Sequence, residues 1–376
     1  MTSDLSSLRE RIEAIDRQII ALFAERLRIV EDVALAKLRA ASPFRDRERE
    51  ELLLRRLREL ATASGLDPHQ VERIYRVVMD MSVAHQEATM RARSDAPLRV
   101  AYQGVEGSYS HLAAQRRYGG RAGGTLLVGH DSFRAAAGAV TSGAADLALL
   151  PIENTTAGSI DDTYDLLADG PLVITGEEIS AIEHCLLALP GVGLDELRVV
   201  MSHPQALAQC HTLFATHPQL VARPEIDTAG SARRVRDAGD RTLAAIASAA
   251  AATTYGLAIV ARGVQSAAGN ATRFVEISLH AAPVPDGAMA KTSLVFSLAD
   301  RPGVLGEILV RLAARNLSLT KIESRPIADA PFTYRFYADV IGHAASESFV
   351  AALDDIAPLV TQVRVLGTYP VAGSRN

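Results

Sequence analysis

The chain has 376 residues, a formal net charge of −5 and 48% hydrophobic residues. This length predicts two or three domains, and a mild negative charge without a basic tract excludes a typical nucleic-acid-binding protein. The sequence shows no targeting segment and no apolar run long enough to cross a membrane. Its two cysteines lack the spacing of a metal site or a disulfide framework. We therefore expect a cytoplasmic protein with no metal, no cofactor and no membrane or nucleic-acid partner.

Residues 5–39 predict one long helix. Apolar residues recur at three- and four-residue spacing, which places them along one face of that helix. They are Leu8, Ile12, Ile15, Ile19, Leu22, Ile29 and Val33. A helix about 50 Å long cannot be covered by a small monomeric domain, so we expect it to pair with a second copy in a homodimer or a higher homo-oligomer.

Polar side chains accompany the apolar faces of this helix and of two more, expected from about residue 46 and from Pro68. The first helix carries Arg9, Arg26 and Lys37. The second helix carries Asp46, Arg49 and Glu50, and its apolar stripe consists of Leu53, Leu57 and Leu60. The third helix carries Ser82 and Gln86, which continue an apolar stripe of Val71, Ile74, Tyr75 and Val78. Burying a charge without a partner is costly. The cations therefore meet either protein carboxylates that lock the bundle or a bound anion, and their excess over the acids favours the anion.

This all-helical segment resembles the chorismate mutase domain of the bifunctional chorismate mutase–prephenate dehydratases, through "LRERIEAID", "AER", "ALAKL", "PFRDRERE" and "SVAHQ". The resemblance implies an active site formed by Arg9, Arg26, Lys37, Asp46, Arg49, Glu50, Ser82 and Gln86. Arginines suit the two carboxylates of chorismate, and Lys37 and Gln86 would stabilise charge on the breaking ether oxygen. Glu50 and Ser82 would bind the substrate hydroxyl. The family pattern assigns Arg9 to the neighbouring subunit's site.

Residues 97–280 predict an α/β domain. Strands are expected at 98–103, 147–152, 197–202, 242–247 and 274–279, with helices at 204–214 and 231–238 between them. Ligands of such sheets bind beyond the carboxyl ends of strands, and polar motifs follow several of these strands. The motifs "GVEGSYSH", "PIENTTAGSI", "SHPQALAQC" and "GNATRF" resemble the prephenate dehydratase family, in the order that this family has them.

The dehydratase resemblance implies two lobes, like those of a type II periplasmic binding protein, with the active site in the cleft between them. Because aromatisation drives the reaction, the site must mainly assist the departing hydroxyl group by donating a proton or a hydrogen bond. By resemblance, Thr272 is that donor, and Glu153, Asn154, Ser202 and Gln209 line the cleft. Arg273 would anchor the pyruvyl carboxylate, whereas His203 is expected to be a structural cap. Arogenate dehydratases share these motifs, so arogenate stays open as the substrate.

Residues 291–371 predict the ferredoxin-like order strand, helix, strand, strand, helix, strand. The segments "RPGVLGEIL" and "KIESRP" resemble an ACT domain, the amino-acid-binding regulatory module. The resemblance implies that phenylalanine binds at Gly303, Val304, Leu305, Glu323, Ser324, Arg325 and Pro326, at an interface between paired domains. The alternative is a module that only dimerises.

Together the segments predict three domains: an all-α chorismate mutase domain (1–93), a two-lobed α/β prephenate dehydratase domain (97–280) and an α+β ferredoxin-like ACT domain (291–371). The chain is expected to rearrange chorismate to prephenate and to convert prephenate to phenylpyruvate, with feedback inhibition by phenylalanine. Two alternatives are a non-catalytic sensor of aromatic acids and a monofunctional dehydratase whose helical domain only dimerises. The complete mutase set and Thr272 argue against both.

Overall fold

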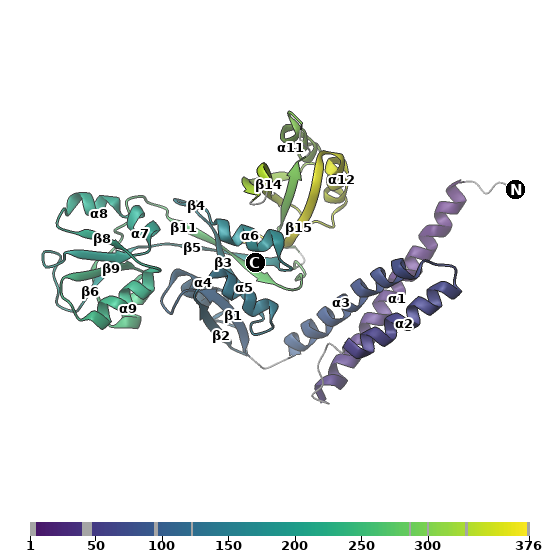
Figure 1. Cartoon of the computed structure of the whole chain (residues 1–376), viewed down its shortest axis with the longest axis horizontal. Helices are drawn as coiled ribbons and strands as arrows, with labels where there is room; N and C mark the ends of the chain where they lie inside the picture. The colour runs from purple at the N-terminus through teal and green to yellow at the C-terminus, as the bar shows by residue number, and fades with distance from the viewer. Residues whose placement is uncertain are drawn as a thin grey trace. The chain divides into compact units, whose positions relative to one another are not determined.

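The computed structural model describes residues 5–39, 47–93, 97–121, 123–285, 287–298, 301–327 and 330–373. The chain separates into two units, Met1–Ala96 and Pro97–Asn376, and each is described by itself (Figure 1). None of the helices in these described ranges is long and apolar enough to cross a membrane.

The first unit is all helix, as predicted. Its described part contains α1 (Leu5–Arg39), α2 (Arg47–Ala63) and α3 (Pro68–Arg93), and α3 packs against both of the others (Figure 1). The Asp67 carboxylate accepts a hydrogen bond of 2.9 Å from the amide of His69. Asp67 therefore caps α3 one residue ahead of a first-turn proline, which confirms the predicted start of this helix.

The apolar faces of these helices differ from the predicted ones within a single chain. Six residues of the expected α1 stripe are exposed, namely Leu8, Ile12, Ile15, Ile19, Leu22 and Ile29. On α2 the buried residues are Leu54 and Ala61, whereas Leu60 is exposed, and on α3 Val78 is buried and Ile74 is exposed. The predicted burial of Leu60 and Ile74 is therefore wrong for one chain, because α3 covers a different face of α2. The stripe on α1 stays without a cover from the described residues of its own chain.

The second unit begins with a lobe built on a mixed sheet of strand order β2-β1-β3-β11-β5, with β4 paired to β3. Its strands are β1 (Leu98–Gln103), β2 (Thr125–His130), β3 (Leu147–Asn154), β4 (Gly158–Ser159), β5 (Val173–Ala181) and β11 (Ala271–Ser278), and its helices are α4 (Tyr109–Tyr118), α5 (Phe133–Thr141) and α6 (Asp161–Asp169). Strand β11 arrives late in the sequence and runs antiparallel to both β3 and β5.

A second lobe is inserted between β5 and β11. Its sheet has the order β10-β6-β9-β7-β8. The strands are β6 (Cys185–Ala188), β7 (Val199–Ser202), β8 (Val221–Pro224), β9 (Leu243–Ala247) and β10 (Ala258–Ala261), and the helices are α7 (Pro204–Gln209), α8 (His211–Thr216), α9 (Thr228–Ala238) and α10 (Ala249–Tyr255). The chain thus crosses between lobes twice, at residues 182–184 and 262–270, which is the expected type II periplasmic-binding-protein-like fold. The predicted helix 204–214 is broken at Cys210, whose backbone leaves the helical region.

The C-terminal part has the predicted βαββαβ order. Its elements are β12 (Ala290–Leu298), α11 (Val304–Ala314), β13 (Ser318–Ile327), β14 (Ala330–Ile341), α12 (Glu347–Ile356), a 3₁₀ turn (Ala357–Leu359) and β15 (Val360–Pro370), and the sheet order is β13-β14-β12-β15. One face of this sheet packs on α11 and α12. The other face joins the core of the first lobe, since Val295, Tyr337 and Tyr369 cluster with Leu167 and Ile174.

Gly367 of β15 lies at a point where two backbones nearly touch. A Cβ atom at this position would overlap the carbonyl oxygen of Ile174 on β5. Because overpacking of this kind costs about 1–3 kcal/mol, we expect Gly367→Val to lower the melting temperature of the dehydratase–ACT unit by about 2 °C or more. Calorimetry checks this, with Gly306→Ala as the control, because a Cβ on Gly306 meets no atom within 4 Å. An unchanged melting temperature in Gly367→Val would contradict the close packing.

Candidate active site

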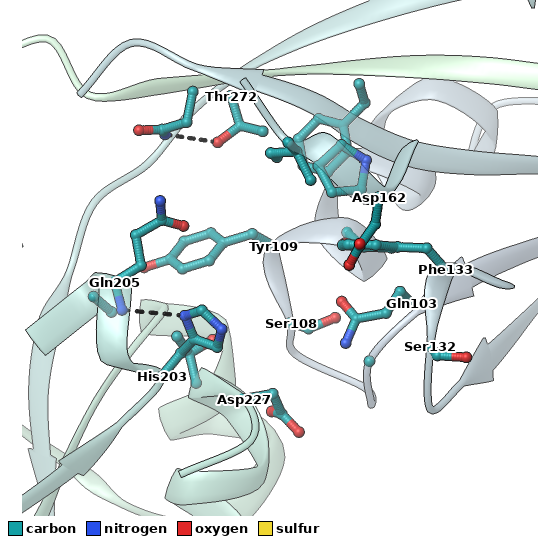
Figure 2. Close-up of a pocket in the computed structure, with 18 of the residues that line it drawn as sticks. Gln103, Ser108, Tyr109, Ser132, Phe133, Asp162, His203, Gln205, Asp227 and Thr272 are labelled. Carbon is teal, nitrogen blue, oxygen red and sulfur yellow. Dashed lines mark hydrogen bonds between the residues drawn. The ribbon is translucent and has the colours of Figure 1, made fainter. Parts of the chain in front are cut away.

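A cleft of about 740 Å³ lies between the two lobes of the second unit. In Figure 2 Thr272 of the first lobe lies across the cleft from the second-lobe residues His203, Gln205 and Asp227. The first lobe also supplies Gln103, Ser108, Tyr109, Ser132, Phe133 and Asp162. Most of these polar side chains end in hydroxyl or amide groups, which suits a site that donates hydrogen bonds to a departing oxygen.

Three predicted residues meet at the hinge side of the cleft. Asn154 at the end of β3 donates from Nδ2 to the hydroxyl oxygen of Thr272 on β11, at 2.9 Å. Gln209 at the end of α7 donates from Nε2 to Asn154 Oδ1, at 3.2 Å. All three side chains line the cleft. The pairing of β3 with β11 sets Thr272 directly opposite Asn154, which explains why motifs more than a hundred residues apart form one site.

Three helices have their N-terminal caps at the cleft. Ser108 caps α4 by accepting from the amide of His111, Ser132 caps α5, and Asp227 caps α9. All three caps line the cleft. The positive ends of helices favour anionic groups, so this lining suits the carboxylates of a small acid.

His203 is the cap that the sequence predicted. Its Nδ1 accepts a hydrogen bond of 3.2 Å from the amide of Gln205 at the start of α7 (Figure 2). Burial lowers the pKa of His203, although the charge of Asp227 opposes this shift. A neutral imidazole that caps a helix is well suited to shape the cleft wall.

Two residues of the cleft were not anticipated from the sequence. His184 lies in the first crossover and is 2% exposed, and its Nε2 atom contacts Gln209 Oε1 at 2.7 Å. Its Nδ1 atom contacts the hydroxyl of Tyr109 at 2.8 Å. Tyr109 stands inside the "GVEGSYSH" motif, which was a usable signal, whereas His184 lies outside every motif.

Three of the residues predicted for the dehydratase site are not among the residues that line the cleft. Ser202 is fully buried and donates to the carbonyl of Ile246 at 2.6 Å, so it holds β7 to β9. Glu153 and Arg273 lie on the opposite face of the sheet from Asn154 and Thr272, because successive side chains of a strand point to opposite faces. They do not belong to the lining of the cleft.

Arg273 contacts acids of both the first lobe and the C-terminal domain. Its guanidinium lies 3.2 Å from Glu153, 3.3 Å from Glu177 and 2.8 Å from Asp339 of β14. Burial lowers the pKa of Arg273, but the charge of Asp339 and of the other acids raises it more, so the net pKa lies above its ordinary value. The guanidinium is therefore engaged by protein carboxylates.

Two lysines complete this ionic cluster, which we call the Arg273 cluster: Glu153, Glu177, Arg273, Lys291, Lys321 and Asp339. Lys291 of β12 lies 2.8 Å from Glu177, and Lys321 of β13 lies 3.0 Å from Glu153. Burial raises the pKa of Glu177, but hydrogen bonds from Lys291 and the Ala372 amide outweigh it, and the net pKa is lowered. The cluster joins the C-terminal sheet to the back of the cleft.

The ion pairs of Arg273 predict how its replacement affects stability and substrate binding. Arg273→Gln leaves Glu177 and Asp339 short of a partner, and breaking a buried ion pair costs about 3 kcal/mol or more. We therefore expect the melting temperature to fall by about 5–10 °C, while the KM for prephenate changes by less than about threefold. Calorimetry and steady-state kinetics check this. A large rise in KM at an unchanged melting temperature would restore Arg273 as the substrate anchor.

The helical unit brings two of its predicted site residues together. Arg26 of α1 donates to the hydroxyl of Ser82 on α3 and, at 3.5 Å, to the carbonyl of Val78. Ser82 is buried, Glu50 is half-buried, and Arg9 and Arg49 are exposed. Lys37 and Gln86 belong to α1 and α3, but their side chains, like all of Asp46, lie outside the described residues. The polar interior thus contains at least one of the predicted cations.

The predicted effector residues fall at two places in the C-terminal domain. Gly303 precedes α11 with a φ of 82°, a conformation that favours glycine, and Val304 is buried behind it. On β13 the half-buried residues are Glu323 and Arg325, whereas Ser324 and Pro326 are exposed. Arg325 forms ion pairs with Asp161 and Asp165 of α6, the latter at 3.0 Å.

The folds and the cleft define a two-lobed α/β enzyme with an appended ferredoxin-like module. Family models match prephenate dehydratase at residues 100–282, chorismate mutase type II at residues 8–87 and the ACT domain at residues 292–358.

Within the described ranges, no group of three or more His, Cys, Asp or Glu side chains is arranged to hold a metal ion.

Named relatives agree with the family models. A bifunctional chorismate mutase/prephenate dehydratase from Escherichia coli (strain K12) is 37% identical over 98% of this chain and 97% of its own length. An arogenate dehydratase/prephenate dehydratase from Arabidopsis thaliana is 41% identical over 77% of each chain. A prephenate dehydratase from Arthrobacter aurescens, solved in complex with L-Phe, is 30% identical with a TM-score of 0.66, over 74% of this chain and 91% of its own. The chain belongs to the family of bifunctional chorismate mutase/prephenate dehydratases.

Proposed function

We propose that this chain is a bifunctional enzyme of phenylalanine biosynthesis. It rearranges chorismate to prephenate in its helical unit, and it decarboxylates and dehydrates prephenate to phenylpyruvate in the cleft of its second unit. The observation that carries the second activity is the Thr272–Asn154 pair at the wall of a cleft rich in hydroxyl and amide groups. We assign residues 1–93, 97–280 and 291–371 to the mutase, dehydratase and ACT domains.

In the dehydratase reaction the ring carboxylate leaves as carbon dioxide and its bonding electrons enter the ring. The C–O bond to the ring hydroxyl breaks, and that oxygen accepts a proton and leaves as water. Thr272 donates the hydrogen bond that assists this departure, and solvent restores the proton. Asn154 and Gln209 hold Thr272 in place and contact the substrate. The helix N-termini of the cleft stabilise the pyruvyl carboxylate, a role that the sequence had assigned to Arg273.

In the mutase reaction the C–O bond of the enol ether breaks as a C–C bond forms, and no proton moves. Catalysis therefore consists of binding a reactive conformer and stabilising charge on the ether oxygen. Lys37 and Gln86 serve that oxygen, and Arg26, Arg49 and the partner's copy of Arg9 serve the two carboxylates. Asp46, Glu50 and Ser82 complete the site.

The mutase site is proposed to form in a homodimer. Six apolar residues of α1 are exposed in one chain, and a second α1 would cover them. Arg9, which is exposed at the start of the same helix, then reaches the neighbouring site. The compartment that we propose is the cytoplasm, which suits the two free and buried cysteines.

Phenylalanine is the proposed feedback inhibitor, bound at the ACT domain by Gly303, Val304, Leu305, Glu323, Ser324, Arg325 and Pro326. The relative from Arthrobacter aurescens was solved with L-Phe, which supports this ligand. Arg325 pairs with Asp165 of α6, and Asp165 lines the cleft. A ligand that alters the position of β13 therefore acts on α6, provided that its affinity differs between two states.

Incubation with chorismate tests all of these assignments together. Prephenate and then phenylpyruvate should accumulate, and phenylalanine should slow the second step. A sensor would form neither product, and a monofunctional dehydratase would act only on added prephenate. Competition between prephenate and arogenate decides the substrate of the cleft, and a strong preference for arogenate would overturn prephenate.

A further inference from the structure

The cleft contains a connected hydrogen-bond network that begins at Thr272 and ends at His184. Asn154 contacts Thr272, Gln209 contacts Asn154, and His184 contacts Gln209 at 2.7 Å. Tyr109 closes the network at 2.8 Å from His184. Gln209 belongs to the second lobe, whereas Thr272 and Asn154 belong to the first, so the network spans both lobes next to a crossover.

Backbone amides fix the orientation of Asn154. Its Oδ1 atom lies 3.0 Å from the amide nitrogens of both Thr156 and Ala157. A backbone N–H only donates, so the atom that faces these two amides must be the acceptor oxygen. The Nδ2 group of Asn154 therefore faces Thr272, and it shares its two hydrogens among the Thr272 hydroxyl oxygen, Asn270 Oδ1 and the carbonyl oxygen of Ala271.

The fixed Asn154 oxygen determines the orientation of Gln209. Because Asn154 Oδ1 only accepts, Gln209 presents its Nε2 group to it, at 3.2 Å. Gln209 Oε1 then faces His184, and it also accepts from Asn270 Nδ2 at 3.2 Å. An oxygen opposite the imidazole Nε2 at 2.7 Å requires a proton on that nitrogen.

The tautomer of His184 follows from this chain of donors. Burial lowers the pKa of His184, and the hydrogen bond with Gln209 only partly opposes that shift, so the ring is neutral and carries its proton on Nε2. Nδ1 then carries no proton, and it shares the hydroxyl proton of Tyr109 with the carbonyl oxygen of Glu183, which lies 2.8 Å from the same hydroxyl. Both ring nitrogens are engaged with protein groups, so His184 does not deliver a proton to a ligand.

The direction of the Thr272 hydroxyl group, at the other end of the network, determines what Thr272 can donate to. The oxygen of Thr272 accepts from Asn154, so its own hydroxyl proton is directed away from Asn154. Thr272 lines the cleft, and an acceptor in the cleft, such as a departing hydroxyl group, can receive that proton. Without Gln209 the Asn154 oxygen keeps its backbone donors but loses a contact from the second lobe.

We propose that His184 is a positioning residue of the dehydratase, which acts through Gln209 and Asn154 to hold Thr272 as a hydrogen-bond donor toward the substrate. This inference rests on the proposed dehydratase function. It adds a residue that does not touch the reacting atoms but holds Gln209 against Asn154, and it couples the Asn154–Thr272 pair to the approach of the second lobe.

The first test measures the tautomer without reference to activity. In the full-length protein labelled with ¹⁵N-histidine, the long-range ¹H–¹⁵N spectrum should show the His184 ring neutral with its proton on Nε2, assigned by loss of the signal in His184→Gln. Tyr109→Phe removes the donor to Nδ1 and should shift the Nδ1 resonance. A ring protonated on Nδ1, or a charged ring at pH 7.5, would overturn the inference.

The second test measures kinetics with prephenate. His184→Leu removes the donor to Gln209, and we expect kcat to fall about tenfold or more while KM changes little. His184→Gln restores an N–H donor and should recover kcat to within about threefold of the parent. The control is His211→Gln on α8, because His211 is exposed and does not belong to the cleft lining. The melting temperature of each variant reports whether the dehydratase–ACT unit is folded.

The outcomes separate the inference from the function on which it rests. An equal kcat for His184→Leu and the parent would overturn the positioning role, and so would a loss that appears only in KM. If the parent protein does not dehydrate prephenate at all, the proposed function fails, while the tautomer of His184 can still be measured.

Discussion

Replacement of Thr272 by valine should lower the kcat of prephenate dehydration by about 10²–10⁴-fold, the usual contribution of a positioned proton donor. Valine keeps the branched shape of a side chain that is 8% exposed and removes only the hydroxyl group. Steady-state assays with prephenate measure the loss. The mutase activity of the same variant should be unchanged, because Thr272 belongs to the other unit of the chain.

Two further variants make this test specific. Thr272→Ser keeps a hydroxyl group and should retain much of the activity, and Thr253→Val on the exposed side of α10 should behave like the parent. A Thr272→Val variant that keeps more than a tenth of the parental kcat would remove Thr272 from the chemical step.

In the two lobes the sequence predicted five strands and missed β2, β4, β5, β6, β8 and β10, and it did not indicate the direction of each side chain. β1 was expected at its observed bounds, and the other expected strands differ by a few residues at their ends. The "TRF" and "PIEN" motifs placed Thr272 and Asn154 in one site, and the structure brings them together. Their neighbours Arg273 and Glu153 were assigned to the same site because a motif is contiguous in sequence, whereas a strand alternates its faces.

His184 and Tyr109 were missed for a different reason. His184 meets Gln209 over 25 positions and Tyr109 over 75 positions of sequence. Only the crossover between the lobes brings these residues together, so their spacing in the sequence does not predict the network.

The exposed stripe of α1 is a different case. The periodicity correctly indicated an apolar face, but the described residues of a single chain do not contain the surface that covers it.

Strands β3 and β11 each present one residue to the cleft and the next residue to the ACT sheet. Asn154 and Thr272 line the cleft, while Glu153 and Arg273 join Lys321 and Asp339 on the other side. We therefore propose that a shift of the ACT sheet reaches the two strands that carry Asn154 and Thr272. This shared use of two strands gives the proposed feedback a short physical path, without a separate relay of residues.

Replacement of Lys37 by alanine should lower the kcat/KM of chorismate rearrangement by about 10²–10³-fold, the scale of one preorganised charge stabiliser in a closed site. Lys37 is one of only three lysines in a chain that otherwise uses arginine, and its compact ammonium group suits a single ether oxygen. Lys37→Arg should therefore restore little activity, because a planar fork does not fit one acceptor.

The same Lys37→Ala protein should dehydrate added prephenate at the parental rate, and an unchanged helical circular-dichroism signal and melting temperature separate loss of the mutase site from loss of the fold. Arg55→Ala is the matched control, since Arg55 is an exposed cation on α2 outside the proposed site. With chorismate as the only substrate, Lys37→Ala should form phenylpyruvate slowly, because little prephenate is produced for the dehydratase site. Near-parental mutase activity in Lys37→Ala would contradict the proposed mutase site and would leave the three helices with the role of pairing two chains.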